Sequence, residues 1–245
     1  MVFLPIQART LLAKEKANSV DDVRLDLPAR YMWGWQPHKS GFCGSMTVQT
    51  INLYYGNWIS QGLVRASNGN NELNTFEDIE HAMTVLKMEF KSWDYHNMQT
   101  PQHEAFWKWV KSHFKNGIPI LGTVYDKGHG HYTNFDHIIP YVGYYSENGL
   151  EYSENDKIYY NDLYYTFTRE ATLKDFIRTP EDCHTEKTTY HDWCMQKDVN
   201  YGSAVYGFKG IEETVRTKLN VGRIDEPDWS NEDKVNEKPV LLTGT

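Results

Sequence analysis

The stretch Gln36-Pro-His-Lys-Ser-Gly-Phe-Cys43-Gly-Ser-Met46 places a cysteine between two glycines and leads into the apolar run 46–58. We expect that run to form a helix with Cys43 at its start. At a helix start, the backbone amides and the positive end of the dipole favour the thiolate over the thiol. The side-chain amide of Gln36, upstream, is a candidate donor to an oxyanion. A lone cysteine is usually a small core residue instead, so this stretch alone leaves both interpretations open.

A histidine and two further polar residues lie in a strand-like part of the chain. Two runs rich in β-branched and aromatic residues, 134–144 and 157–164, flank an Asn-Gly pair, which predicts an antiparallel hairpin or meander. His137 then lies at the start of the first strand, and Asn161 and Asp162 lie at the end of the second. Neighbouring antiparallel strands bring such ends together. A base oriented by a third polar group is what an activated thiol needs, although a strand histidine by itself is more often structural.

The chain order of cysteine, histidine and Asn/Asp, with the residues around each, resembles the papain-like cysteine peptidases. Within them, the sequence is most similar to the branch that contains the bacteriocin leader peptidases and their stand-alone relatives. The resemblance covers roughly residues 24–165. The features that carry it are a short strand expected over 24–28, Gln36, the helix start Cys43-Gly44 with the helical stretch after it, His137 in an apolar strand that ends in Gly143-Tyr144, and Asp162 after the next strand.

The resemblance implies a thiol-dependent hydrolase that cleaves an amide or peptide bond through an acyl-enzyme on Cys43. His137 would act as general base and then general acid, and Asp162, in preference to Asn161, would orient its imidazole. The backbone amide of Cys43 and the side chain of Gln36 would stabilise the oxyanion. No cofactor or metal ion is expected, and the expected partner is a peptide or protein substrate.

The sequence leaves two other functions open. A catalytically silent peptide- or glycan-binding module could use the same scaffold, since a fold does not determine a function. The aromatic content of 14% suits a binding groove as well as an aromatic-rich core. An acyltransferase or ligase could use the same thioester, because it differs from a hydrolase only in the acceptor that reaches the acyl-enzyme.

The distribution of patterns along the chain predicts an α+β fold, with helices in the first half and an antiparallel sheet in the second. Amphipathic patterns predict helices over 76–88 and 103–115, the first with Asn74 or Thr75 as its N-cap. Apolar runs predict a strand that ends at Tyr125 and a last core strand over 201–208.

The expected domain organisation is a papain-like catalytic domain over 24–210. An N-terminal arm over 1–23 precedes it, and a polar extension over 211–245, ending in a short strand, follows it. A chain of 245 residues is long enough for one core and too short for two full-sized domains with linkers.

Charge and hydropathy exclude two classes of partner. The chain carries a formal net charge of −8, whereas a nucleic-acid-binding surface is basic, so no nucleic acid is expected. No segment approaches the ~20 consecutive apolar residues of a membrane-spanning helix, so no membrane span is expected. The sequence does not indicate an oligomeric state.

The other two cysteines, Cys183 and Cys194, lie in a polar stretch with weak periodicity. We expect a disulfide between them, because such a loop has little apolar surface with which to order itself, and a bridge of this kind contributes about 3 kcal/mol. Free thiols are an alternative, as is a zinc site with His184 and His191, whose spacing matches no common zinc finger. A disulfide implies a secreted protein or another oxidising compartment, although residues 1–6 do not form a secretory signal.

Overall fold

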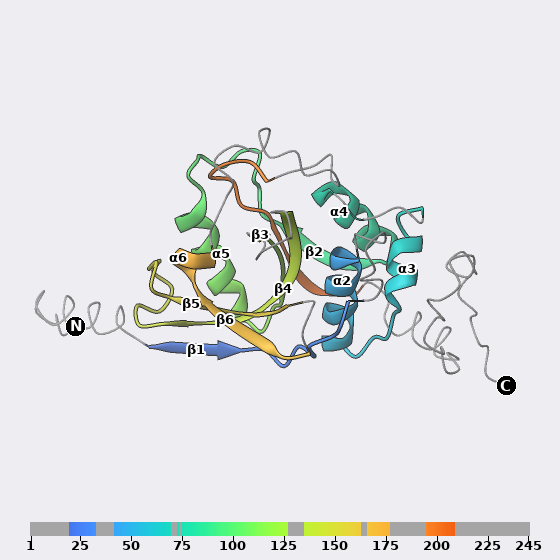
Figure 1. Ribbon diagram of the computed structural model, residues 1–245, viewed down its shortest axis with the longest axis horizontal. Helices are drawn as coiled ribbons and strands as arrows, with labels where there is room; N and C mark the ends of the chain where they lie inside the picture. Colours follow the sequence, from blue (N-terminus) through green and yellow to red (C-terminus); the bar gives the residue numbers. More distant parts are fainter. Residues whose placement is uncertain are drawn as a thin grey trace, which may run out of the picture.

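The computed structural model describes residues 20–32, 42–69, 73, 75–126, 135–162, 166–176 and 195–208. Over these residues the chain forms an antiparallel sheet of seven strands, with helices on both of its faces (Figure 1). The strands are β1 (Asp21–Arg24), β2 (Met88–Ser92), β3 (Ile120–Asp126), β4 (Phe135–Ser146), β5 (Lys157–Asn161), β6 (Thr168–Thr172) and β7 (Gly202–Phe208). The helices are α2 (Cys43–Tyr54), α3 (Gln61–Ala66), α4 (Phe76–Val85), α5 (His103–Phe114) and α6 (Leu173–Phe176). The α+β class predicted from the sequence is confirmed.

Strand β4 organises the sheet, whose order is β2-β7-β3-β4-β5-β6. Strand β3 pairs with the first part of β4, and β1 pairs with its last part, from Gly143 to Ser146. On the other side of β4 lies β5, with Tyr160 opposite Tyr141. This confirms the predicted antiparallel pairing of the two strands on either side of the Asn-Gly pair.

Strand alternation divides the apolar side chains between two cores, one on each face of the sheet. Figure 1 shows α2, α3 and α4 on one side of the sheet and α5 and α6 on the other. In β4, Ile138 packs into the first core with Val48 of α2, whereas its neighbour Ile139 packs into the second core with Trp107 of α5. Met46, in the first turn of α2, reaches the second core, so the start of this helix lies where the two cores meet.

The ends of the predicted helices follow local backbone chemistry. Helix α2 begins at Cys43, as predicted, but ends at Tyr54 because Gly56 adopts a φ of 75° and its amide donates to Leu53 O at 2.9 Å. Helix α4 begins after Thr75, one of the two predicted N-caps, in a capping box with Asp78. It ends earlier than predicted because the chain from Met88 onward enters β2.

Four elements lie outside the predicted set: β2, β6, α3 and α6; β1 begins three residues before the short strand expected over 24–28. They are short, and β6 in particular is exposed and polar along most of its length, so their local patterns are weak. Strand β1 brings residues 21–23, which the sequence assigns to an N-terminal arm, into the sheet. Residues 1–19 of that arm and the extension over 211–245 lie outside the described residues.

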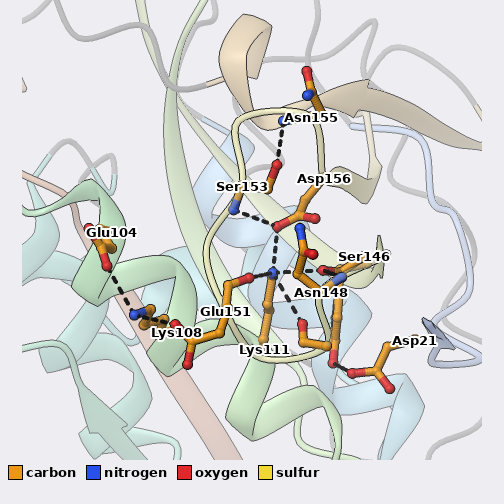
Figure 2. A network of polar contacts seen from close by, with 12 residues as sticks. Asp21, Glu104, Lys108, Lys111, Ser146, Asn148, Glu151, Ser153, Asn155 and Asp156 are labelled. Carbon is orange, nitrogen blue, oxygen red and sulfur yellow. Dashed lines mark hydrogen bonds and ion pairs between the residues drawn. The ribbon is translucent and has the colours of Figure 1, made fainter. Parts of the chain in front are cut away.

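A buried ion pair fastens α5 to the turn between β4 and β5 (Figure 2). The side chains of Lys111 and Asp156 are 1% and 3% exposed, and their charged groups are 2.5 Å apart. Lys111 also donates to the hydroxyl of Ser146 and to the backbone carbonyls of Gly149 and Glu151. Burial lowers the pKa of Lys111, and the hydrogen bond to Asp156 opposes that shift. These five residues, the Lys111 cluster, hold together the turn that joins two central strands.

Candidate active site

Cys43 is the first residue of α2, and no side-chain oxygen caps this helix. The N-cap position is Phe42, whose side chain has no acceptor for the first-turn amides, and the first turn, Cys43-Gly-Ser-Met46, contains no acidic residue. By contrast, side-chain oxygens cap both α3 and α4. The positive end of the α2 dipole therefore lies at the half-buried Cys43, and a helix start is a position that generally favours a thiolate.

The first turn of α2 lies against β4 at Ile138, the residue next to His137. A Cβ added at Gly44 would lie 3.5 Å from Ile138 Cδ1 and 3.0 Å from Leu73 Cβ, so the helix approaches this closely because a glycine stands there. One turn further on, the buried hydroxyl of Thr47 donates to Ile138 O at 3.1 Å. The structure thus places the start of the helix that carries the cysteine beside the strand that carries the histidine.

His137 lies in β4 with 5% of its surface exposed, opposite Val124 of β3. Burial disfavours its charged form and lowers its pKa from 6.5 to about 4, while the negative charge of Asp162 opposes the shift. The imidazole is therefore neutral near pH 7. This is the form that can accept a proton from a thiol.

Asp162 lies on the same face of the sheet as His137. In β5, Ile158 and Tyr160 pack against the second core, and Asp162 continues that alternation directly after the strand. In β4, Ile139 packs against the same core, so His137, two residues earlier, faces the same way. The electrostatic effect of Asp162 on the imidazole agrees with this placement. The structure brings these two predicted site residues together.

Asn161 lies on the opposite face and has structural partners. Its side-chain amide donates to Leu27 O at 3.2 Å, and its side-chain oxygen accepts from the hydroxyl of Thr168 at 2.8 Å. The residue is fully buried, and these bonds tie β5 to β6 and to the segment that follows β1. Asn161 therefore faces away from the imidazole.

Three predicted residues lie outside the described residues: Gln36, Cys183 and Cys194. The oxyanion role of Gln36 and the disulfide between the two cysteines stay predictions. His184 and His191, which the zinc alternative adds to the same cysteines, also lie outside the described residues.

Arg169 is a residue of this region that sequence analysis missed. From β6, its Nη1 donates to Asp162 Oδ2 at 2.7 Å. The strand reads Thr168-Arg-Glu-Ala-Thr172, a polar run with no distinctive spacing to the other site residues. Only the register of β6 on β5, with Arg169 opposite Tyr160, brings the guanidinium to the carboxylate.

Comparison with known proteins adds no family: no family model matches the chain, and no curated protein matches it either. In the part of the chain that the structure describes, no group of three or more His, Cys, Asp or Glu could hold a metal ion. Among the same residues, no helix combines the length and the apolar character needed to cross a membrane. What the site offers chemically is a thiol at a helix start, a buried neutral imidazole and a carboxylate.

Proposed function

We propose that the protein is a papain-like thiol hydrolase that cleaves an amide or peptide bond through an acyl-enzyme on Cys43. One observation carries the proposal. Cys43 begins a helix without a capping side chain, and that helix packs on the part of β4 that holds the buried, neutral His137, with Asp162 on the same face as the imidazole. The same order along the chain is found in the peptidase family that the sequence resembles: a cysteine at a helix start, then a histidine in a strand, then a carboxylate after the next strand.

In the first half of the reaction, the sulfur of Cys43 attacks the substrate carbonyl carbon while His137 takes the thiol proton. The dipole of α2 stabilises the developing thiolate, and the backbone amide of Cys43 donates to the oxyanion, together with Gln36 in the proposed assignment. His137 then gives its proton to the amine as the carbon–nitrogen bond breaks. The products of this half are the free amine and a thioester on Cys43.

In the second half, a water molecule attacks the thioester while His137 takes one of its protons. The carbon–sulfur bond then breaks, the proton passes to the sulfur, and the carboxylic acid product leaves. An imidazolium forms in both halves inside a buried site that disfavours charge, and Asp162 offsets that cost. An amine that reached the thioester in place of water would make the protein an acyltransferase or ligase.

The proposal is tested by turnover of a mixed peptide pool, followed by mass spectrometry. The wild-type chain is expected to cleave at least one class of peptide, and Cys43→Ala is expected to cleave none. Ser45→Ala is a matched control from the same helical turn, because the buried hydroxyl of Ser45 makes no hydrogen bond among the described residues. It should retain turnover. Turnover retained in Cys43→Ala would exclude the thiol mechanism, and peptides bound but left intact by the wild-type chain would favour a silent binding module.

A further inference from the structure

Three neighbouring strands bring an imidazole, a carboxylate and a guanidinium to the same face of the sheet. His137 comes from β4, Asp162 follows β5, and Arg169 comes from β6, where it lies opposite Tyr160. Paired residues of antiparallel strands share a face, so Arg169 lies on the face of Tyr160 and of Asp162, two residues further on. The carboxylate therefore has the imidazole on one side and the guanidinium on the other.

The contact between Arg169 and Asp162 differs from an ordinary surface ion pair. Arg169 Nη1 lies 2.7 Å from Asp162 Oδ2; the arginine side chain is 43% exposed, but the carboxylate side chain is only 11% exposed. On the same two strands, Lys157 and Glu170 also form an ion pair, but their side chains are 43% and 52% exposed. A carboxylate removed from water depends on its partner for orientation far more than an exposed one does.

We propose that Arg169 is a positioning residue of the candidate active site, which holds the carboxylate of Asp162 in the orientation that addresses His137. This inference rests on the proposed function and deepens it. A hydrogen bond from the guanidinium to one carboxylate oxygen restricts rotation of the whole group, so its other oxygen keeps a constant direction. In this arrangement Arg169 acts on the imidazole through Asp162.

The guanidinium also influences the charge of the imidazole. Near His137, the carboxylate of Asp162 follows β5 and the residue opposite on β3 is the uncharged Val124, while Cys43 of α2 packs against the core on whose face His137 lies. The positive charge of Arg169 partly offsets the negative charge that would otherwise stabilise the imidazolium. Removing Arg169 should therefore make His137 easier to protonate and its imidazole less ordered.

The test compares Arg169→Gln and Arg169→Lys with Lys157→Gln, a matched control that breaks the exposed ion pair of the same two strands. Nitrogen-15 NMR of the full chain reports the tautomer of His137 at pH 7 and its titration midpoint. We expect one dominant tautomer in the wild-type chain. Arg169→Gln should give a mixture and raise the midpoint by about half a unit to one unit. Arg169→Lys should restore the dominant tautomer in part, and Lys157→Gln should leave both readouts unchanged.

An unchanged tautomer and midpoint in Arg169→Gln would overturn the inference, and so would an equal change in Lys157→Gln. The rate of Cys43 alkylation by iodoacetamide is measured on the same samples. It distinguishes a failure of this inference from a failure of the proposed function. A wild-type chain whose Cys43 reacts no faster than a small-molecule thiol would contradict the hydrolase proposal. The His137 signals would still decide whether Arg169 positions Asp162.

Discussion

Two buried polar sites share the β4–β5 part of the sheet, and they differ in how their charges are compensated. In the Lys111 cluster, one ammonium group meets one carboxylate, one hydroxyl and two carbonyls (Figure 2). At the candidate active site, burial opposes the charged form of His137 while Asp162 favours it. The first arrangement surrounds one charge with four hydrogen-bond partners. The second holds an imidazole that can gain and lose a proton, as acid–base chemistry requires.

The comparison shows that burial of an ionisable group does not by itself indicate function. A buried charge that is fully hydrogen-bonded stabilises a particular geometry, and removing its partner costs stability. Burial and a nearby carboxylate act in opposite directions on the pKa of Lys111 and on that of His137 alike. The two groups differ in their chemistry, because an imidazole ordinarily titrates near neutral pH and can transfer a proton there, so changing its neighbours should alter reactivity. Substitutions in the Lys111 cluster should therefore change the free energy of unfolding, and substitutions around His137 should change chemistry and pH dependence.

The largest expected effect is on stability. Lys111→Met leaves the carboxylate of Asp156 buried without its cation, so we expect the free energy of unfolding to fall by about 3–5 kcal/mol. The control is Lys108→Met on the same helix, because the ion pairs of Lys108 with Glu104 and Glu151 are solvent-exposed. That variant should lose about 1 kcal/mol or less. Denaturant unfolding measures both, and equal losses would remove the distinction between the Lys111 cluster and surface ion pairs.

The next effect is a pH dependence of stability that arises from His137. Its pKa is about 4 in the folded chain against an ordinary value of 6.5, so the unfolded state binds more protons between these two values. Stability should therefore fall as the pH drops from 6.5 towards 4, by up to about 3 kcal/mol, and level off below that for this group.

Urea unfolding across this pH range checks the expectation. In His137→Gln, the part of the slope that comes from the imidazole should disappear, whereas the carboxylates remote from His137 contribute equally to both chains. If the free energy of unfolding depends on pH in the same way in wild type and variant, then the pKa of His137 is not lowered in the folded state.

A smaller effect separates the two candidate orienting residues. Asp162→Ala should lower turnover by about tenfold or more, because the imidazolium loses the carboxylate that stabilises it. Asn161→Ala should keep most of the turnover and lose about 1–2 kcal/mol of stability, because it removes the hydrogen bonds to Leu27 and Thr168. Steady-state kinetics with a cleaved peptide ranks the two, and the reverse ranking would assign the orienting role to Asn161.

Sequence reasoning succeeds here where the determinants are local. The glycine-flanked turn and the apolar run that follow Gln36 predict a helix start at Cys43, and α2 begins there. Alternating β-branched and aromatic residues on both sides of an Asn-Gly pair predict the antiparallel strands β4 and β5. The opposite faces of Asn161 and Asp162 follow from strand alternation alone.

The parts that sequence analysis missed depend on how distant segments meet. Lys111 lies in an amphipathic helix where a lysine is ordinarily solvent-exposed, and it is buried because the turn between β4 and β5 folds over it. Arg169 lies in an exposed, polar strand, and only the β5–β6 register shows its partner. Neither contact has a spacing along the chain that a pattern could detect.

The central claim is that His137 and the start of α2 together activate Cys43. The most direct measurement is the pH dependence of Cys43 alkylation by iodoacetamide, read by peptide mapping in the wild-type chain and in His137→Ala. The account predicts a midpoint within ~3.5–7.5, rapid labelling at pH 6, and much slower labelling in the variant. A midpoint near ~8.5, the value of an ordinary thiol, that is unchanged in His137→Ala would contradict it.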